Sequence, residues 1–299
     1  MLYYFIINGR EDIRVRADEL LDAQLPSLDI QYKKYYTLGI GDATRFVSMQ
    51  CDLFPKEQVC FVSCGGSGLV NEISSAVVGQ PGKHMAIIAL GETNDMIKYW
   101  PGRDFTSVRK IIVGEEKNVD IIKVADSYCF NMINCGFDAM AGYKALRYMD
   151  HGVPAEPAYR KGIFFSMLTQ RFHHIKITAD GKPVNRRTML MCTLGNACWC
   201  GGQFHSTPLA KNDDGLIDIL YLRTMTLVEF LVSMLIFRAD KHMQSRFFRR
   251  RSKYITARKV TLDSKDLIVL CIDGEFVALP HFDIEILPSS VKLILPVES

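Results

Sequence analysis

A run of glycines follows an apolar stretch near residue 60 and has the composition of a phosphate-binding loop. Residues 59–63 are expected to form a buried strand, Cys64-Gly65-Gly66-Ser67-Gly68 follows, and helical spacing begins at Leu69. Without a Cβ, Gly65, Gly66 and Gly68 allow bare backbone to approach an anion, and the following helix directs its positive N-terminus at it. A glycine cluster after a strand can equally serve as a tight turn, so this first loop alone leaves both interpretations open.

A second polar loop, Gly91-Glu92-Thr93-Asn94-Asp95, opens directly after the apolar residues 85–90. Asn71-Glu72 stands on the first turns of the helix that follows the first loop. Two acidic Asp-Gly sequences, Asp213-Asp214-Gly215 and Asp273-Gly274-Glu275, lie far along the chain. Taken singly, each Asp-Gly pair indicates an ordinary turn.

The elements that must position these residues alternate over the first 115 residues. Strands are expected at residues 2–7, 28–36, 59–63 and 85–90. A helix over 42–51 can be capped by Asp42 and places Ala43, Val47 and Cys51 on one face, and a second helix over 69–78 stops at Gly79. Strands separated by helices of this length favour a parallel sheet covered by helices.

From residue 119 onward the pattern changes to short strand-like runs. They cover residues 175–179, 188–195, 216–222, 255–262, 267–272 and 282–286. Two helical stretches interrupt them, one within 137–148 and one at 227–237. The second half is therefore expected to be mainly β.

Composition places the chain among proteins with a sizeable core and reduced cysteines. It has 299 residues, 48% of them hydrophobic, and nine scattered cysteines, an odd number set mostly in apolar segments. Cys198 and Cys200 do not have a metal-ligand spacing, and only His205 lies nearby. The apolar runs at 2–7 and 227–237 are too short for a signal peptide or a membrane span, so a soluble, cytoplasmic protein is expected.

An ordered series of motifs resembles the diacylglycerol kinase catalytic family, which includes bacterial soluble lipid kinases and the sphingosine and ceramide kinases. The family pattern is a Gly-Gly-Asp-Gly-Thr loop followed by Asn-Glu, and then a Gly-Thr-x-Asn-Asp loop. Both are recognisable in the first and second loops. Further matches come in order: Gly41-Asp42-Ala43, Val119-Asp120-Ile121, Asn134-Cys135-Gly136-Phe137-Asp138-Ala139, Asp213-Asp214-Gly215-Leu216-Ile217-Asp218 and Asp273-Gly274-Glu275.

The resemblance implies an N-terminal Rossmann-like α/β nucleotide-binding domain and a mainly β, sandwich-like domain after it. We expect the first domain over residues 1–118, completed by the C-terminal segment 287–299, and the lipid-substrate domain over 119–286. The active site of such proteins lies in the cleft between the domains. The implied reaction transfers the γ-phosphate of ATP to a lipid hydroxyl, which requires a phosphate cradle, Mg²⁺ and a group that accepts the hydroxyl proton.

Roles follow from the resemblance position by position. Asp273 is the candidate general base, with Glu275 beside it and Asp120 as a further catalytic acid on a facing strand. Asp95, and less directly Glu72, are candidates for binding Mg²⁺ or water around the phosphates, and Lys98 replaces an Arg that contacts phosphate. Asp213 and Asp214 resemble a segment that holds a structural Mg²⁺. The expected nucleotide contacts are Gly65, Gly66, Ser67, Gly68, Glu72, Gly91, Glu92, Thr93, Asn94, Asp95 and Lys98.

Several positions depart from the family pattern. Ser67 replaces the central Asp of the first loop, Leu69 replaces its Thr, and Glu92 replaces the Thr of the second loop. The Asn-Pro-x-Ser-Gly segment of the family appears only as Asn8-Gly9-Arg10-Glu11. We hypothesise that Glu92 returns the carboxylate lost at Ser67, provided that the two side chains face each other.

A basic segment suggests a membrane partner. Residues 238–259 hold nine Lys or Arg and the single acid Asp240, so the rest of the chain is net negative although the total charge is +3. Phe247 and Phe248 lie among these cations, a combination suited to anionic lipid headgroups. The alternative is a solvated strand edge that carries Arg against unwanted pairing. Peripheral attachment to anionic membranes is expected, nucleic acid binding is not, and a homodimer stays open.

Three functions therefore compete. The first is an ATP- and Mg²⁺-dependent lipid kinase acting on diacylglycerol or a related amphiphile, favoured by Asp95, Asp120, Asp273 and Glu275. The second is a catalytically impaired relative that binds lipid, nucleotide or a partner, favoured by Ser67, Leu69 and Glu92. The third, an NAD kinase type, shares the first loop but does not call for Asp273-Gly274-Glu275.

Overall fold

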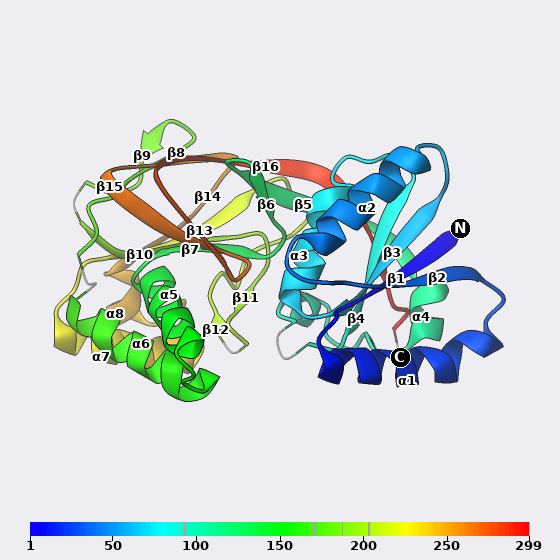
Figure 1. Cartoon of the computed structure of the whole chain (residues 1–299). Coiled ribbons are helices and arrows are strands. Elements are labelled where there is room, and N and C mark those ends of the chain that lie inside the picture. Colours follow the sequence, from blue (N-terminus) through cyan, green and yellow to red (C-terminus); the bar gives the residue numbers. More distant parts are fainter. Residues whose placement is uncertain (92–93, 170–171, 187, 203, 299) are drawn as a thin grey trace. The chain divides into compact units, whose positions relative to one another are not determined.

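The computed structural model describes residues 1–91, 94–169, 172–186, 188–202 and 204–298. The chain forms two compact units (Figure 1). Unit 1 contains Met1–Ile121, Asn212–Asp214 and Leu287–Ser299, and unit 2 contains Ile122–Lys211 and Gly215–Ile286. Among the described residues, no helix is long and apolar enough to cross a membrane.

Unit 1 is built on a parallel sheet, as its alternating pattern predicts. Its strands are β1 (Leu2–Ile7), β2 (Gln31–Tyr36), β3 (Val59–Gly65) and β4 (Lys83–Ala89), in the order β4-β3-β1-β2. Neighbouring strands run parallel, with Phe5 opposite Val62 and Phe61 opposite Met85. Because all four point the same way, their carboxyl ends, and the loops that follow them, lie at one edge of the sheet.

Helices cover both faces of this sheet. Residues Ile13 and Leu21 of α1 (Glu11–Gln24) share a core with Ile111 of α4 (Val108–Ile112) and with Phe5 on the sheet. The next residue back, Tyr4, points to the opposite face, where its hydroxyl donates to Gln50 of α2 (Asp42–Leu53) at 2.7 Å. Helix α3 (Ser67–Val77) packs on the same side as α2. The short 3-10 helices are η1 (Leu25–Ser27) and η2 (Met96–Tyr99).

The start of α2 differs from the expected capping. Gly41, in the left-handed region at φ 80°, is the N-cap residue. Asp42 is the first residue of the helix, and its side chain does not cap it. The Asp42 carboxylate instead accepts the Leu38 amide at 2.9 Å and the Tyr35 hydroxyl at 2.8 Å. The prediction of an Asp42 cap was therefore wrong, because the carboxylate stabilises the loop before the helix.

Two long strands contribute residues to both units. In β16 (Glu275–Leu295), the first part pairs with β15 in unit 2, whereas Leu293 and Ile294 pair in parallel with β4 in unit 1. Strand β5 (Glu115–Val124) pairs with β16 and with β6 (Ser127–Cys129). The C-terminal residues therefore extend the sheet of unit 1.

Unit 2 is mainly β, in agreement with its short apolar runs. Its strands follow the order β14-β13-β10-β7-β15-β16, with antiparallel neighbours. A register shift between Asp263 and Ile268 divides β15, whose first part pairs with β8 and whose second part pairs with β7. The bend closes the sheet over one core, as in a sandwich. The strands are β7 (Met132–Gly136), β8 (Lys176–Ala179), β9 (Lys182–Pro183), β10 (Met189–Gly195), β11 (Trp199–Cys200), β12 (Phe204–His205), β13 (Ile217–Arg223), β14 (Ser252–Ala257) and β15 (Lys259–Ile272).

The run over 255–262 is two strands rather than one. Strand β14 ends at Ala257 and β15 begins at Lys259. The Asp180 carboxylate accepts the amides of Arg258 and Lys259 at 3.0 and 2.9 Å, so the backbone leaves the ladder here. This contact joins residues almost eighty positions apart, which explains why the local pattern did not predict the break.

Four helices lie on unit 2 (Figure 1): α5 (Phe137–Asp150), α6 (Ala155–Thr169), α7 (Leu227–Arg238) and α8 (Arg246–Arg249). The sequence predicts α5 and α7, whereas α6 and α8 were not expected. Helix α6 crosses α5 closely, because a Cβ on Gly162 would lie 2.4 Å from the Ala141 carbonyl oxygen. Helix α7 begins with a capping box, in which Thr226 accepts the Glu229 amide and the Glu229 carboxylate accepts the Thr226 amide.

Candidate active site

The first loop presents bare backbone at the start of α3. Gly65 ends β3, Gly66 is the N-cap and Ser67 is the first helical residue. Gly68 is exposed, and a Cβ on it would meet no atom within 4 Å in the part of the chain that the structure describes. The amides of Gly68 and Leu69 lie in the first turn, where the helix supplies no acceptor. The loop therefore offers an open, positively polarised surface that suits a phosphate group.

The second loop is locked onto the first. The Gly65 carbonyl oxygen accepts the amides of Leu90 at 3.2 Å and Gly91 at 2.9 Å, and the Asn94 side-chain amide at 3.1 Å. A Cβ on Gly91 would lie 2.3 Å from the Gly66 Cα, so only glycine fits at this position. The glycine is needed for this close approach and not for an unusual φ, since neither residue has a positive φ.

Polar side chains of the second loop lie beside this junction. Asn94 Oδ1 is buried and has no hydrogen-bond partner among the residues that the structure describes. The buried Asp95 carboxylate is 2.8 Å from the Lys98 amino group, on the following η2 helix. Asn94 Oδ1, which has no partner among the described residues, suits a hydrated metal ion at this edge of the unit 1 sheet, and the Lys98 amino group suits a phosphate. Glu92 and Thr93, and with them the hypothesis that Glu92 replaces the lost carboxylate, lie outside the described residues.

The Glu72 side chain hydrogen-bonds to the N-terminus of α2. Its Oε2 accepts the amide of Ala43 at 3.0 Å and that of Thr44 at 3.4 Å, and its backbone oxygen accepts the Thr44 hydroxyl. The carboxylate thus occupies the positive end of α2, a stabilising arrangement for an acid. Glu72, in the helix that follows the first loop, therefore joins α3 to α2.

Asp120 lies at a junction within unit 1. Its side chain is 1% exposed, its Oδ1 accepts the Ser289 amide at 2.8 Å, and its own amide donates to the Asn212 carbonyl oxygen at 2.7 Å. Next to Asn212, Asp213 pairs with Lys117 at 3.1 Å. Asp120 thus ties three separate stretches of chain together.

A metal centre is not preformed in the part of the chain that the structure describes. There, no group of three or more His, Cys, Asp or Glu side chains converges as a metal site would require. Cys198 donates to the Ala210 carbonyl oxygen, and Trp199 stacks on His205 with ring centroids 4.4 Å apart. The oxygens for Mg²⁺ would have to come from Asp95, Asn94 and the phosphates themselves, as is common for this ion.

In unit 2, the Asp273 carboxylate holds a turn together. Oδ1 accepts the amides of Asn131 at 3.0 Å and Met132 at 2.9 Å, and the Cys129 thiol at 3.2 Å. Oδ2 accepts the Phe130 amide at 2.6 Å. Asp273 itself has a left-handed backbone at φ 48°, a conformation that Asp adopts more readily than most residues. The Asn131 amide also approaches Oδ2, at 3.3 Å, so contacts from four consecutive residues hold the carboxylate in one orientation.

Two further carboxyl groups lie near this turn. Glu275 begins β16 and is exposed. Asp138, in the first turn of α5, accepts the Ala139 amide at 2.9 Å, and burial raises the pKa of its carboxyl to about 7. Burial raises the pKa of the Cys271 thiol to about 12, and the Asp138, Asp273 and Glu275 carboxylates add smaller effects in the same direction. Sequence reasoning quoted Asp138 within a motif without giving it a role.

Comparison with known proteins assigns both halves of the chain. Residues 3–124 match the family described as diacylglycerol kinase catalytic domain. Residues 131–295 match the family described as YegS C-terminal NAD kinase beta sandwich-like domain. The chain belongs to the diacylglycerol kinase family. The predicted family and fold, an α/β catalytic domain followed by a sandwich-like domain, are confirmed.

Relatives of this kinase family match along most of the chain. "Probable lipid kinase YegS-like" of Serratia proteamaculans (strain 568) is 25% identical over 97% of this chain and 93% of its own length. A diacylglycerol kinase of Staphylococcus epidermidis (strain ATCC 12228 / FDA PCI 1200) is 26% identical over 88% of this chain and 81% of its own length. The crystal structure of a diacylglycerol kinase from Bacillus anthracis str. Sterne has the same fold, with a TM-score of 0.68 at 18% identity over 98% of this chain and 96% of that one.

A kinase family implies the use of ATP, and the first loop fits its phosphates. The lipid kinase loops of this chain keep Gly65, Gly66, Gly68 and Gly91, the positions at which the backbone is bare or closely packed. Leu69, where the family pattern has Thr, is buried and lies against Gly65, because a Cβ there would meet Leu69 Cδ2 at 2.9 Å. Leu69 therefore supports the loop from below and offers no hydroxyl to a phosphate.

Proposed function

We propose that this protein is an ATP-dependent lipid kinase that transfers the γ-phosphate to the hydroxyl of diacylglycerol or a related amphiphile. One observation carries the proposal: the Gly65 carbonyl oxygen joins the two loops at the start of α3, with Gly91 packed on Gly66. Among the described residues, no atom lies within 4 Å of the place that a Cβ on Gly68 would take, so the first turn of α3 is open there. Such a surface binds phosphate by hydrogen bonds and by the partial positive charge of the helix.

Charge on the phosphates is offset by groups of the second loop. Lys98 supplies a cation that Asp95 holds at 2.8 Å, so the amino group keeps one orientation. Asp95 and Asn94 Oδ1, which has no hydrogen-bond partner in the described part of the chain, are the oxygens that would hold Mg²⁺, and this ion would offset phosphate charge. Lys in place of the family's Arg gives a point charge without a bidentate fork.

The hydroxyl proton is assigned to Asp273. Phosphoryl transfer passes through a loose transition state, in which positioning matters more than a strong base. A carboxylate fixed by the amides of Phe130, Asn131 and Met132 meets that need, because it presents Oδ2 in one orientation. Glu275, two residues after Asp273 at the start of β16, adds a further carboxyl group.

A second candidate function is binding of nucleotide or lipid without transfer. It is favoured by Ser67, which stands in place of the family's acidic residue at the start of α3, and by the apolar Leu69. Loss of that acid removes an oxygen ligand for metal or water. An intact phosphate cradle with impaired chemistry would then bind ATP and leave it unchanged.

Transfer of label from γ-³²P-ATP to a panel of lipids in mixed micelles separates the two candidates. The kinase proposal predicts labelled lipid with the wild type, abolished by Asp273→Asn in a folded sample. Label that appears only with Ser67→Asp, which restores the family's acid, would favour the binding protein. If neither wild type nor Ser67→Asp labels the lipid fraction under conditions in which both bind ATP, the kinase proposal is overturned.

A further inference from the structure

Helices α6 and α7 lie over the same face of the unit 2 sheet (Figure 1). Ile163 and Met167 of α6 share one apolar cluster with Phe230 of α7, against Leu190 and Leu220 on strands β10 and β13. The inner faces of α6 and α7 therefore pack against this cluster. The outer faces of the two helices belong to one side of the unit.

The outer face of α7 is apolar from Leu227 to Leu235, and Arg238 follows on the same face. Leu227, Val228, Leu231, Val232 and Leu235 are all exposed, and at 100° per residue they fall within one arc. Val228 and Leu235 are 71% and 70% exposed. A helix packed on a protein in water normally places polar residues there. Helix α6 adds Phe164, Phe165 and Leu168, also exposed, and we call this set of eight side chains the α6/α7 surface.

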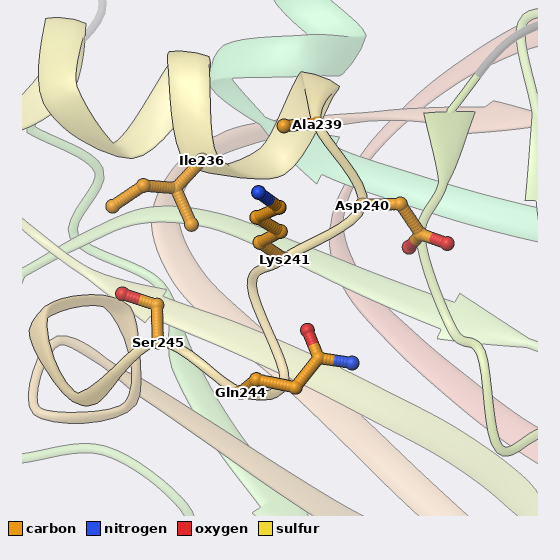
Figure 2. Close-up of a pocket in the computed structure, with 6 residues that line it drawn as sticks. All are labelled: Ile236, Ala239, Asp240, Lys241, Gln244 and Ser245. Carbon is orange, nitrogen blue, oxygen red and sulfur yellow. The ribbon is translucent and has the colours of Figure 1, made fainter.

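A pocket opens at the C-terminal end of this surface (Figure 2). Ile236, near the end of α7, and Ala239, its C-cap, line the apolar side of the pocket. Its volume is about 680 Å³. Lys241, Gln244 and Ser245 supply an amino group, an amide and a hydroxyl, the groups that bind a phosphate diester. The fourth polar residue, Asp240, is 3.0 Å from His205.

Cations outnumber acids around the surface, and Asp240 is the acid that lines the pocket. Arg238, Arg246, Arg249 and Arg250 are exposed, and none has an acidic partner within 4 Å among the described residues. The acids nearby are each engaged. Glu229 is 2.6 Å from Arg251, and Glu156 is 3.8 Å from Arg160. The surface therefore presents apolar side chains beside unneutralised cations, the pattern of a segment that lies in an anionic membrane interface.

We propose that the α6/α7 surface docks on a lipid bilayer that contains anionic phospholipid, with its apolar side chains in the interface and a headgroup phosphate beside Lys241, Gln244 and Ser245. Exposed leucines would leave water, and the arginines would face the charged headgroups. The inference deepens the proposed function, since a kinase for a membrane lipid must reach the bilayer. It also narrows the expected membrane contact to part of the segment 238–259, because Arg251 is bound to Glu229 and Lys253 to the Val184 carbonyl oxygen.

Co-sedimentation with vesicles tests the apolar part. Phosphatidylcholine vesicles that contain phosphatidylglycerol are mixed with wild type, Leu235→Glu and the control Leu267→Glu, without ATP. Leu267 is 68% exposed and lies on a strand, β15, instead of on α6 or α7, which makes it a matched site. Leu235→Glu should weaken binding about tenfold and the control should not change it. Equal binding of the two variants would overturn the proposal, as would sedimentation showing that Leu235→Glu only dissociates a dimer.

The headgroup pocket has its own test in the same assay. Lys241→Ala should weaken binding about fivefold when phosphatidylglycerol is present and leave binding to pure phosphatidylcholine unchanged. The control Lys265→Ala removes an exposed cation of β15 and should have no effect. An equal loss of vesicle binding in Lys241→Ala and Lys265→Ala would show that general surface charge, and not the pocket, attracts the headgroups, and would refute the pocket. Because no ATP is present, these results do not depend on the kinase activity, which a short-chain soluble substrate measures separately.

Discussion

Asp273→Asn tests whether the Asp273 carboxylate is a structural support as well as a reactive group. The substitution keeps the size of the side chain, and Asn adopts a left-handed backbone as readily as Asp. One carbonyl oxygen can still accept the amides of Asn131 and Met132. The new amide group would then face the Phe130 N–H, which now donates at 2.6 Å, so two donors would oppose each other.

The magnitude follows from those bonds. A hydrogen bond to a charged group contributes about 1.5–3 kcal/mol, and the remaining two bonds lose their charge assistance. We expect the free energy of unfolding to fall by about 3–4 kcal/mol. Denaturant unfolding of wild type and variant measures this, with Glu275→Gln as the matched control, since that exposed carboxylate accepts none of these amides. A loss below about 0.5 kcal/mol for Asp273→Asn would refute the reasoning.

Three other predictions follow from single contacts. Gly91→Ala forces a Cβ to within 2.3 Å of the first loop, so unfolding should become easier by about 1–3 kcal/mol, seen as a lower Tm; an unchanged Tm would contradict it. Burial raises the pKa of Asp138 from 3.8 to about 7, so between these pH values the folded state keeps a proton that the unfolded state has lost. The free energy of unfolding should therefore fall by up to about 4 kcal/mol as pH rises from about 4 to 7. Urea titrations should show this decrease in wild type and not in Asp138→Asn. Arg251→Ala removes a pair of hydrogen bonds to Glu229 and should cost about 1–2 kcal/mol in the same titration, whereas Arg250→Ala should stay within about 0.5 kcal/mol; equal effects would show that the ion pair contributes nothing.

Local patterns were sufficient to predict the sheet of unit 1. The strand at residues 59–63 and the α2 face of Ala43, Val47 and Cys51 depend on periodicity alone, and all three of those side chains are buried. Helix α6 was missed because its apolar residues do not keep to one side. Phe164 and Phe165 face solvent, so the amphipathic period is blurred.

The site could be predicted as positions but not as contacts. The glycines of the first loop follow from their place between a strand and a helix. The partners of Asp273 lie more than 140 residues earlier in the chain, and Glu72 reaches an amide 29 residues away. No local pattern encodes such long-range bonds. Likewise, the raised pKa of Asp138 comes from burial, which is a property of the folded unit.

The central claim is that the backbone at the start of α3 binds the phosphates of ATP for transfer to a lipid. Gly68→Ala tests it most directly, because the new Cβ meets no atom of the described residues within 4 Å and alanine favours a helix. Label transfer to diacylglycerol is measured against ATP concentration for wild type, Gly68→Ala and Ser75→Ala, a substitution further along the same helix. We predict an unchanged or higher Tm for Gly68→Ala with a KM for ATP raised about tenfold, and no change for Ser75→Ala. A KM for ATP equal to that of wild type in Gly68→Ala would contradict the account.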